Sequence, residues 1–142
     1  MNLNDKYLHS EVTSEIIRGY YNVYNTLGYG FLEKVYENAL ILELKKMGLK
    51  CEKQKPIKVF YNSENVGEYF ADIIVNECVI VELKAAECLI EEHEAQLTNY
   101  LRATNIEVGL LLNFGKAPEF KRKAFNNQYK NHTSLQLNHD LS

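Results

Sequence analysis

Two stretches near the N-terminus carry hydrophobic residues at every third or fourth position, which predicts two amphipathic helices. The first covers residues 11–27 and ends at the glycines of residues 28–30, because glycine interrupts a helix. The second covers about 32–47, and Gly48 follows it in the place where a left-handed residue often closes a helix. A third helix is expected over 87–103.

Four other stretches predict β-strands. An extended segment lies at 49–61, and Pro56 within it favours an edge position because proline cannot donate a ladder hydrogen bond. Apolar runs at 66–75, 79–84 and 108–113 predict buried strands. A helix between the last two makes a right-handed βαβ unit, which would set them parallel to each other.

The fold class that follows is α/β, with a mixed central sheet flanked by helices. The 142 residues suit one domain, which we place at residues 1–128. A turn at 62–65 and a short basic helix at about 118–128 are expected within it. The polar residues 129–142 are expected to form a loose tail.

Composition and targeting signals predict a soluble, cytoplasmic protein. Hydrophobic residues make up 46% and charged residues 25%, which is typical of a globular domain. No apolar stretch reaches the roughly 18 residues of a membrane span, and the N-terminus lacks the pattern of a signal peptide. Cys51, Cys78 and Cys88 are odd in number and lack CxxC spacing, which argues against zinc and for a reducing compartment.

The distribution of charge bears on the kind of partner. The formal net charge is −3, which counts against tight non-specific binding to a polyanion. Six lysines nevertheless crowd residues 45–58. They either protect a solvated strand edge, which is the favoured interpretation, or form a phosphate-binding stripe. An acidic domain of this size could also need a homodimer or a partner protein to complete its binding surface.

Charged residues inside the apolar strands are the main candidates for chemistry. Asp72 stands in 66–75, and Glu82 and Lys84 stand in 79–84. A buried acid must be paired or bind a metal. These residues therefore either hold a divalent cation beside a lysine or form a plain ion pair. Carboxylate oxygens suit Mg²⁺ or Mn²⁺.

A shared metal requires Asp72 and Glu82 to lie on one face of the sheet. Directly opposed residues of antiparallel strands meet this requirement. If Asp72 stands opposite Glu82, then Val75 pairs with Val79 and the hairpin loop has the three residues 76–78. A two-residue loop would place the acids on opposite faces. We expect the three-residue loop.

Several other polar residues lie on the predicted helices. His93, Gln96 and Tyr100 share a stripe, on which Gln96 needs hydrogen-bond partners, Tyr100 is more often a core residue, and His93 is expected to be structural. Glu33 lies in the first turn of its helix, where an acid is favoured by the helix dipole or could bind a metal. Tyr36 is either a core aromatic with a tethered hydroxyl or a support for the acids.

Five ordered blocks resemble the GxxExxY family, a branch of the PD-(D/E)XK nuclease-like superfamily. They are Gly30-Phe31-Leu32-Glu33-Lys34-Val35-Tyr36, Ala71-Asp72, Val81-Glu82-Leu83-Lys84-Ala85, His93-Glu94-Ala95-Gln96-Leu97 and Leu112-Asn113-Phe114-Gly115. One departure is Ala71, where the superfamily name has proline. The resemblance covers about residues 10–125 and implies a restriction-endonuclease-like core of a helix, three antiparallel strands, a second helix and a further strand.

The resemblance also implies a site. Its metal ligands would be three carboxylates and a backbone carbonyl, those of Glu33, Asp72, Glu82 and Leu83. Lys84 would be the catalytic lysine, and Gln96 and Tyr100 match a Gln-x-x-x-Tyr element of exonuclease-type relatives.

The predicted function is Mg²⁺- or Mn²⁺-dependent hydrolysis of phosphodiester bonds, with DNA as the expected substrate and RNA left open. One alternative is a non-catalytic nucleic-acid-binding or regulatory module that keeps the fold. Another is an interaction protein whose acidic cluster is structural.

Overall fold

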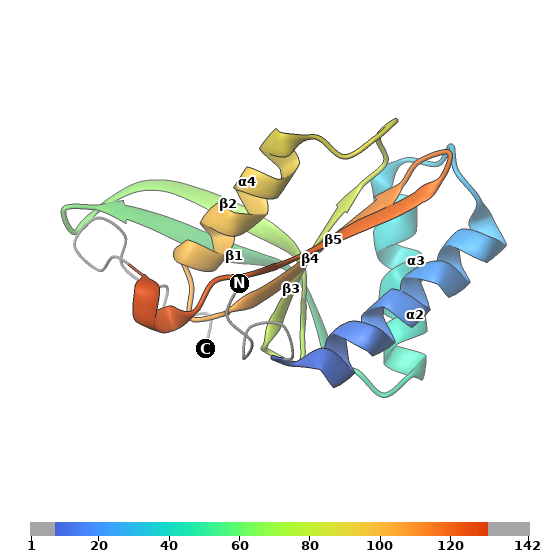
Figure 1. Ribbon diagram of the computed structural model, residues 1–142, viewed down its shortest axis with the longest axis horizontal. Helices are drawn as coiled ribbons and strands as arrows, with labels where there is room; N and C mark the ends of the chain where they lie inside the picture. The colour runs from blue at the N-terminus through green and yellow to red at the C-terminus, as the bar shows by residue number, and fades with distance from the viewer. Residues whose placement is uncertain (1–7, 131–142) are drawn as a thin grey trace.

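The computed structural model describes residues 8–130, which form three α-helices and a five-stranded sheet (Figure 1). The helices are α2 (Ser10–Leu27), α3 (Glu33–Lys46) and α4 (Glu91–Arg102). The strands are β1 (Cys51–Tyr61), β2 (Glu64–Val75), β3 (Val79–Lys84), β4 (Val108–Phe114) and β5 (Pro118–Ala124), followed by a 3₁₀ turn, Asn127–Tyr129. No helix in this part of the chain is long and apolar enough to cross a membrane.

The sheet has the order β1-β2-β3-β4-β5. Strands β3 and β4 are parallel and are connected through α4, while the other neighbouring strands are antiparallel. The predicted α/β class, the mixed sheet and the parallel pairing of 108–113 with 79–84 are therefore confirmed. Strand β1, which contains Pro56, lies at the edge of the sheet as expected.

Helices cover both faces of the sheet (Figure 1). Helices α2 and α3 pack against one face, where alternate residues of β3 from 79 to 83 are buried. Helix α4 packs against the other face, where Ile80 of β3 joins the buried cluster. Because successive residues of a strand point to opposite faces, Glu82 and Lys84 follow Ile80 onto the α4 face. On that face, the C-terminal half of β3 therefore carries charged side chains in place of apolar ones.

The hairpin between β2 and β3 has the predicted register. Val75 pairs with Val79, and Ile73 with Val81, so the loop consists of the three residues 76–78. Asn76 and the residue after it have φ values of 49° and 58°, the left-handed geometry that such a loop requires. One further step of this register brings Asp72 opposite Glu82.

The lysine-rich segment 45–58 is partly neutralised along the edge strand. Lys50 Nζ lies 2.7 Å from Glu77 Oε1, and Lys55 Nζ lies 2.8 Å from Glu52 Oε2. These pairs favour the interpretation as a protected strand edge over that of a continuous phosphate-binding stripe.

Residues 118–124 form strand β5, so the predicted short helix at about 118–128 is wrong. Strand β5 runs antiparallel to β4 with Phe120 opposite Leu112, and Phe120 packs against the core beneath α2 and α3. The reason lies in β4, which is buried along its whole length. Its backbone groups need a ladder partner on both edges, and this tertiary demand outweighs the local basic pattern.

Three boundaries also move. Strand β1 begins at Cys51 rather than at 49. Helix α4 begins at Glu91 rather than at 87, and β2 begins at Glu64, so the turn before it contracts to Asn62 and Ser63. The predicted helix ends at Leu27 and Lys46 hold to within a residue, with Gly48 at a left-handed φ of 87°. Residues 131–142 of the predicted tail lie outside the described residues.

Candidate metal centre

Asp72 and Glu82 meet where β2 and β3 part. The backbone ladder between these strands ends at the pair Ile73–Val81. Beyond it, the Asp72 N–H donates to Glu82 Oε2 at 2.7 Å, and the Leu83 N–H donates to Asp72 Oδ2 at 2.8 Å. Each carboxylate therefore accepts a hydrogen bond from the backbone of the opposite strand. Beyond the backbone ladder, the hydrogen bonds of these two side chains therefore connect the ends of the two strands.

The surroundings of both acids disfavour their charged forms. Glu82 is only 5% exposed, and burial, followed by the negative charge of Asp72, raises its pKa to about 8. Burial also raises the pKa of Asp72, against the opposing effect of the hydrogen bond from Leu83. Two carboxylates in this setting repel each other, and a nearby cation would relieve that repulsion.

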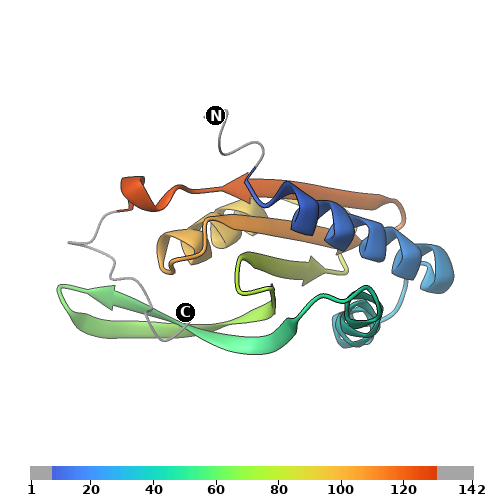
Figure 2. The ribbon, with the colours of Figure 1, turned by 90° about the horizontal axis from the view of Figure 1, so that it is seen from below.

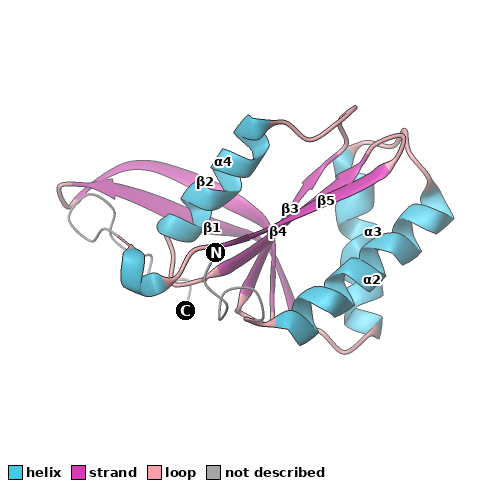
Figure 3. Ribbon diagram, in the orientation of Figure 1, coloured by secondary structure: helices cyan, strands magenta, loops and turns pink. Residues whose placement is uncertain are grey.

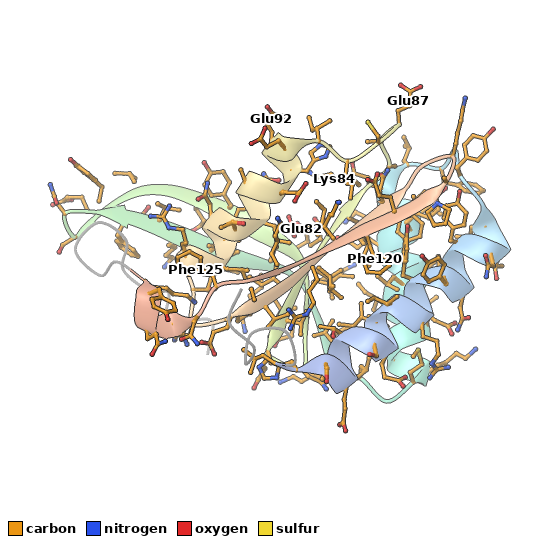
Figure 4. All side chains as sticks on the ribbon, viewed as in Figure 1. Glu82, Lys84, Glu87, Glu92, Phe120 and Phe125 are labelled. Atoms are coloured by element: carbon orange, nitrogen blue, oxygen red, sulfur yellow. The ribbon has the colours of Figure 1, made fainter. Side chains whose placement is uncertain are left out.

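Lys84 supplies the positive charge on the same face as Glu82 (Figure 4). Its charge opposes the rise in the pKa of Asp72, of Glu82 and of Glu33. Lys84 Nζ donates to Gln96 Oε1 at 3.4 Å. Among the described residues, no ion pair within 4.0 Å joins Lys84 to Asp72 or Glu82. The alternative of a plain ion pair with Lys84 is thus not formed among the described residues.

Glu33, the first residue of α3, lines a small cavity together with Asp72. The cavity has a volume of about 120 Å³, and its lining includes Glu33, Asp72 and Leu83. Burial, together with the charge of Asp72, raises the pKa of Glu33. The helix start therefore turns a third carboxylate toward the place where β2 and β3 part.

Tyr36 fixes the loop that leads to Glu33. Its ring is fully buried and stacks on Phe114 with a centroid separation of 4.1 Å. Its hydroxyl donates to the carbonyl oxygen of Gly28 at 2.7 Å and accepts from the Phe31 N–H at 3.2 Å. Of the two predicted roles, Tyr36 has that of a core aromatic with a tethered hydroxyl. It supports the acids only indirectly, through the loop that positions Glu33.

A comparison with protein-family models matches residues 10–123 to the model of the PD-(D/E)XK nuclease superfamily. The chain belongs to the PD-(D/E)XK nuclease superfamily. The match covers the three helices, the sheet except for the last residue of β5, and the acids described above, and it agrees with the α/β fold. A search of curated proteins and a search of solved structures each gave no match.

Two polar residues near Glu33 and Asp72, namely Glu37 and Gln54, were not predicted to belong to the site. Glu37 is only 4% exposed, accepts from Lys34 Nζ and from Gln54 Nε2, both at 2.8 Å, and lines the same small cavity as Glu33. Gln54 also hydrogen-bonds to Asp72 and lowers the pKa of that carboxyl. The spacing of Glu33 and Glu37, one helical turn apart, was a signal that could have identified Glu37.

Gln54 adopts an unusual backbone conformation within an edge strand. Its φ is 53°, and it is skipped in the pairing of β1 with β2, which joins Lys53 to Ile73 and Lys55 to Ala71. A non-glycine residue in left-handed geometry costs free energy. Here the local irregularity accompanies the side-chain bridge from Gln54 to the acids, a tertiary contact that sequence periodicity does not reveal.

Helix α4 carries both residues of the predicted Gln-x-x-x-Tyr element. Gln96 contacts Lys84, as described above. Tyr100 is buried, and burial, followed by the charges of Glu82 and Asp72, raises its pKa to about 12. His93 Nδ1 accepts from the Ile90 N–H at 3.2 Å, a structural role at the helix start, as predicted.

The donor set fits a hard divalent cation, although the ligands are not gathered in advance. Among residues 8–130, no three histidine, cysteine or carboxylate side chains are grouped closely enough to hold a metal ion. Asp72 and Glu82 are linked through hydrogen bonds to the backbone of the opposite strand, whereas Glu33 shares only a small cavity with Asp72. When they are ionised, the three carboxylates outnumber the single neighbouring ammonium, and oxygen-seeking Mg²⁺ or Mn²⁺ would balance their excess negative charge.

Proposed function

We propose that this protein is a Mg²⁺- or Mn²⁺-dependent nuclease that hydrolyses phosphodiester bonds, with DNA as its substrate. The observation that carries the proposal is the pair of hydrogen bonds across the fork of β2 and β3, from the Asp72 N–H to Glu82 and from the Leu83 N–H to Asp72. Lys84 lies on the same strand as Glu82 (Figure 4). Buried acids of raised pKa at such a fork are costly for folding alone. Metal binding in a phosphodiesterase centre would account for these acids, and membership of the superfamily supports this proposal.

Each residue of the site has a distinct role in this proposal. Asp72 and Glu82, with the Leu83 carbonyl, would hold the metal, and Glu33 would complete the set from α3. When bound, the metal would activate a water molecule and stabilise the leaving oxygen. The Lys84 ammonium would bind the phosphate and stabilise the negative charge that develops on its oxygens.

Other side chains position this machinery. Gln96 holds Lys84 Nζ through its amide oxygen and limits the directions in which the ammonium can point. Gln54 links Glu37 to Asp72 and so orients one proposed ligand. Tyr100 forms a partly apolar wall beside the acids.

We further propose that the chain belongs to the GxxExxY branch of the superfamily. Both the sequence motif and its structure support this assignment. In the block Gly30-Phe31-Leu32-Glu33-Lys34-Val35-Tyr36, the tyrosine hydroxyl binds the loop backbone that precedes the glutamate. The naming residues therefore act as a unit that presents Glu33 to the site.

A cleavage assay tests the proposal. Purified protein is incubated with single-stranded DNA, duplex DNA and RNA in Mg²⁺, in Mn²⁺ and in EDTA. Cleavage that requires metal and is lost in Glu82→Gln is expected. Glu87→Gln is the matched control, because Glu87 is exposed on the loop before α4 and points away from Glu82 (Figure 4). Nucleic-acid binding without cleavage under any metal would refute the nuclease and favour the non-catalytic module.

A further inference from the structure

A groove separates α4 from the outer part of the β1–β2 hairpin. This hairpin extends along the edge of the sheet beyond the other strands (Figures 2 and 3). The groove has a volume of about 590 Å³. The side chains that line it come from both elements and include Val59 and Tyr69 of the hairpin and Gln96, Asn99, Tyr100 and Arg102 of α4.

The groove is continuous with the proposed catalytic centre. Gln96 lines the groove and also accepts the hydrogen bond from Lys84 Nζ. Tyr100 lines it too, close enough to Glu82 and Asp72 for their charges to act on its hydroxyl. A molecule lying in the groove would therefore reach the residues that we assign to phosphodiester cleavage.

Aromatic and amide groups make the groove suited to nucleobases. Tyr69 and Tyr100 lie with ring centroids 5.8 Å apart, and Tyr69 is 50% exposed. An exposed ring beside an open groove is a surface on which a base can stack. Gln96 and Asn99 add amides that can pair with base edges.

Charged side chains at the two ends of the groove would determine the orientation of a bound nucleotide. Arg102 lines the groove at one end of α4 and donates to Asn99 Oδ1 at 3.4 Å. Glu92 lines it near the other end of the helix, and its carboxylate would repel phosphates (Figure 4). Bases would enter the groove, while the sugar–phosphate chain would run on the Arg102 side.

We infer that this groove binds unpaired nucleotides next to the phosphate that is cleaved, so that the enzyme acts on single strands or single-stranded ends. The inference rests on the proposed nuclease function and names its substrate class. In a duplex the bases are paired and stacked inside the helix, so they cannot lie against Tyr69 without being extruded. Unpaired bases need no such step.

Binding and cleavage are measured separately to test this inference. Affinity for one labelled sequence, as a single strand and as a blunt duplex, is measured in EDTA by fluorescence anisotropy. Wild type is expected to prefer the single strand, and Tyr69→Ala is expected to weaken that binding about ten-fold, the scale for losing one stacked base. Tyr69→Phe keeps the ring and should bind like wild type.

Tyr61→Ala is the matched control, because Tyr61 is 61% exposed on the same hairpin but does not line the groove. Thermal melting of each variant verifies its fold. Equal affinity of wild type and Tyr69→Ala for the single strand, or equal affinity of wild type for both substrates, would overturn the inference.

The two proposals can fail independently. Single-strand binding that depends on Tyr69, without cleavage in any metal, would support the groove and refute the nuclease. Metal-dependent cleavage of blunt duplex that is unchanged in Tyr69→Ala would support the nuclease and refute the groove. Absence of nucleic-acid binding by wild type in EDTA, together with absence of cleavage in Mg²⁺ and in Mn²⁺, would refute both.

Discussion

The buried carboxyl of Glu82 makes the stability of the metal-free protein depend on pH. Burial and the charge of Asp72 raise its pKa from 4.5 to about 8. Between these two values the folded protein still holds a proton that the unfolded chain has lost. Stability therefore falls as pH rises through this window. At about 1.4 kcal/mol per pH unit, the full effect is about 5 kcal/mol, most of it lost by pH 8.

The perturbation is Glu82→Gln, which keeps the shape and an acceptor for the Asp72 N–H but removes the titrating group. The variant is expected to lose most of the slope and, above pH 7, to be more stable than wild type without metal. Asp72 and Glu33 also have raised pKa values, so a shallower slope of the same sign should remain.

Urea unfolding in EDTA at pH 5, 6, 7 and 8, followed by circular dichroism, measures this dependence. Glu87→Gln should behave like wild type because Glu87 is exposed. Repeating the series in Mg²⁺ should flatten the wild-type curve, since a bound cation favours the ionised acids. Parallel slopes for wild type and Glu82→Gln in EDTA would show that Glu82 is ionised in the folded protein and would refute the reasoning.

Three other outcomes are expected. Mg²⁺ at 100 times its dissociation constant should stabilise the folded state by about 2.7 kcal/mol, and Asp72→Asn should abolish that shift in thermal melting. Lys84→Ala should retain the metal-induced shift but lower the turnover number about 10²- to 10³-fold; unchanged turnover at saturating metal would exclude a catalytic role. Tyr36→Phe should cost about 1–3 kcal/mol of stability in chemical denaturation, because the Gly28 carbonyl and the Phe31 N–H lose their buried partner.

Those parts of the fold that depend on local periodicity could be predicted from the sequence. The apolar runs on either side of residues 76–78 allowed a register that placed Asp72 opposite Glu82, and the ladder follows it. Gly48 marked the end of α3 because only a few residue types favour its backbone geometry. In both cases the determining interaction lies within a few residues of the chain.

Features that depend on distant contacts were missed. Strand β5 forms because β4 needs a partner on its outer edge, and its own sequence alternates too weakly to show this. Helix α4 begins late because the preceding segment is held from elsewhere: the Leu89 N–H donates to Glu119 Oε1 at 2.9 Å. Gln54 gains its place at the site through an irregularity in an edge strand. None of these signals is present in the local pattern.

The three-residue loop at 76–78 constrains how this chain can diverge. It lies at the far end of the hairpin from Asp72 and Glu82, and none of its side chains is assigned to the site. Its length nevertheless decides which face of the sheet receives the two carboxylates. Substitutions in the loop should therefore be accepted readily, whereas insertion or deletion of a single residue should be selected against. Among homologous chains, variable composition at constant length is the expected signature of this hairpin.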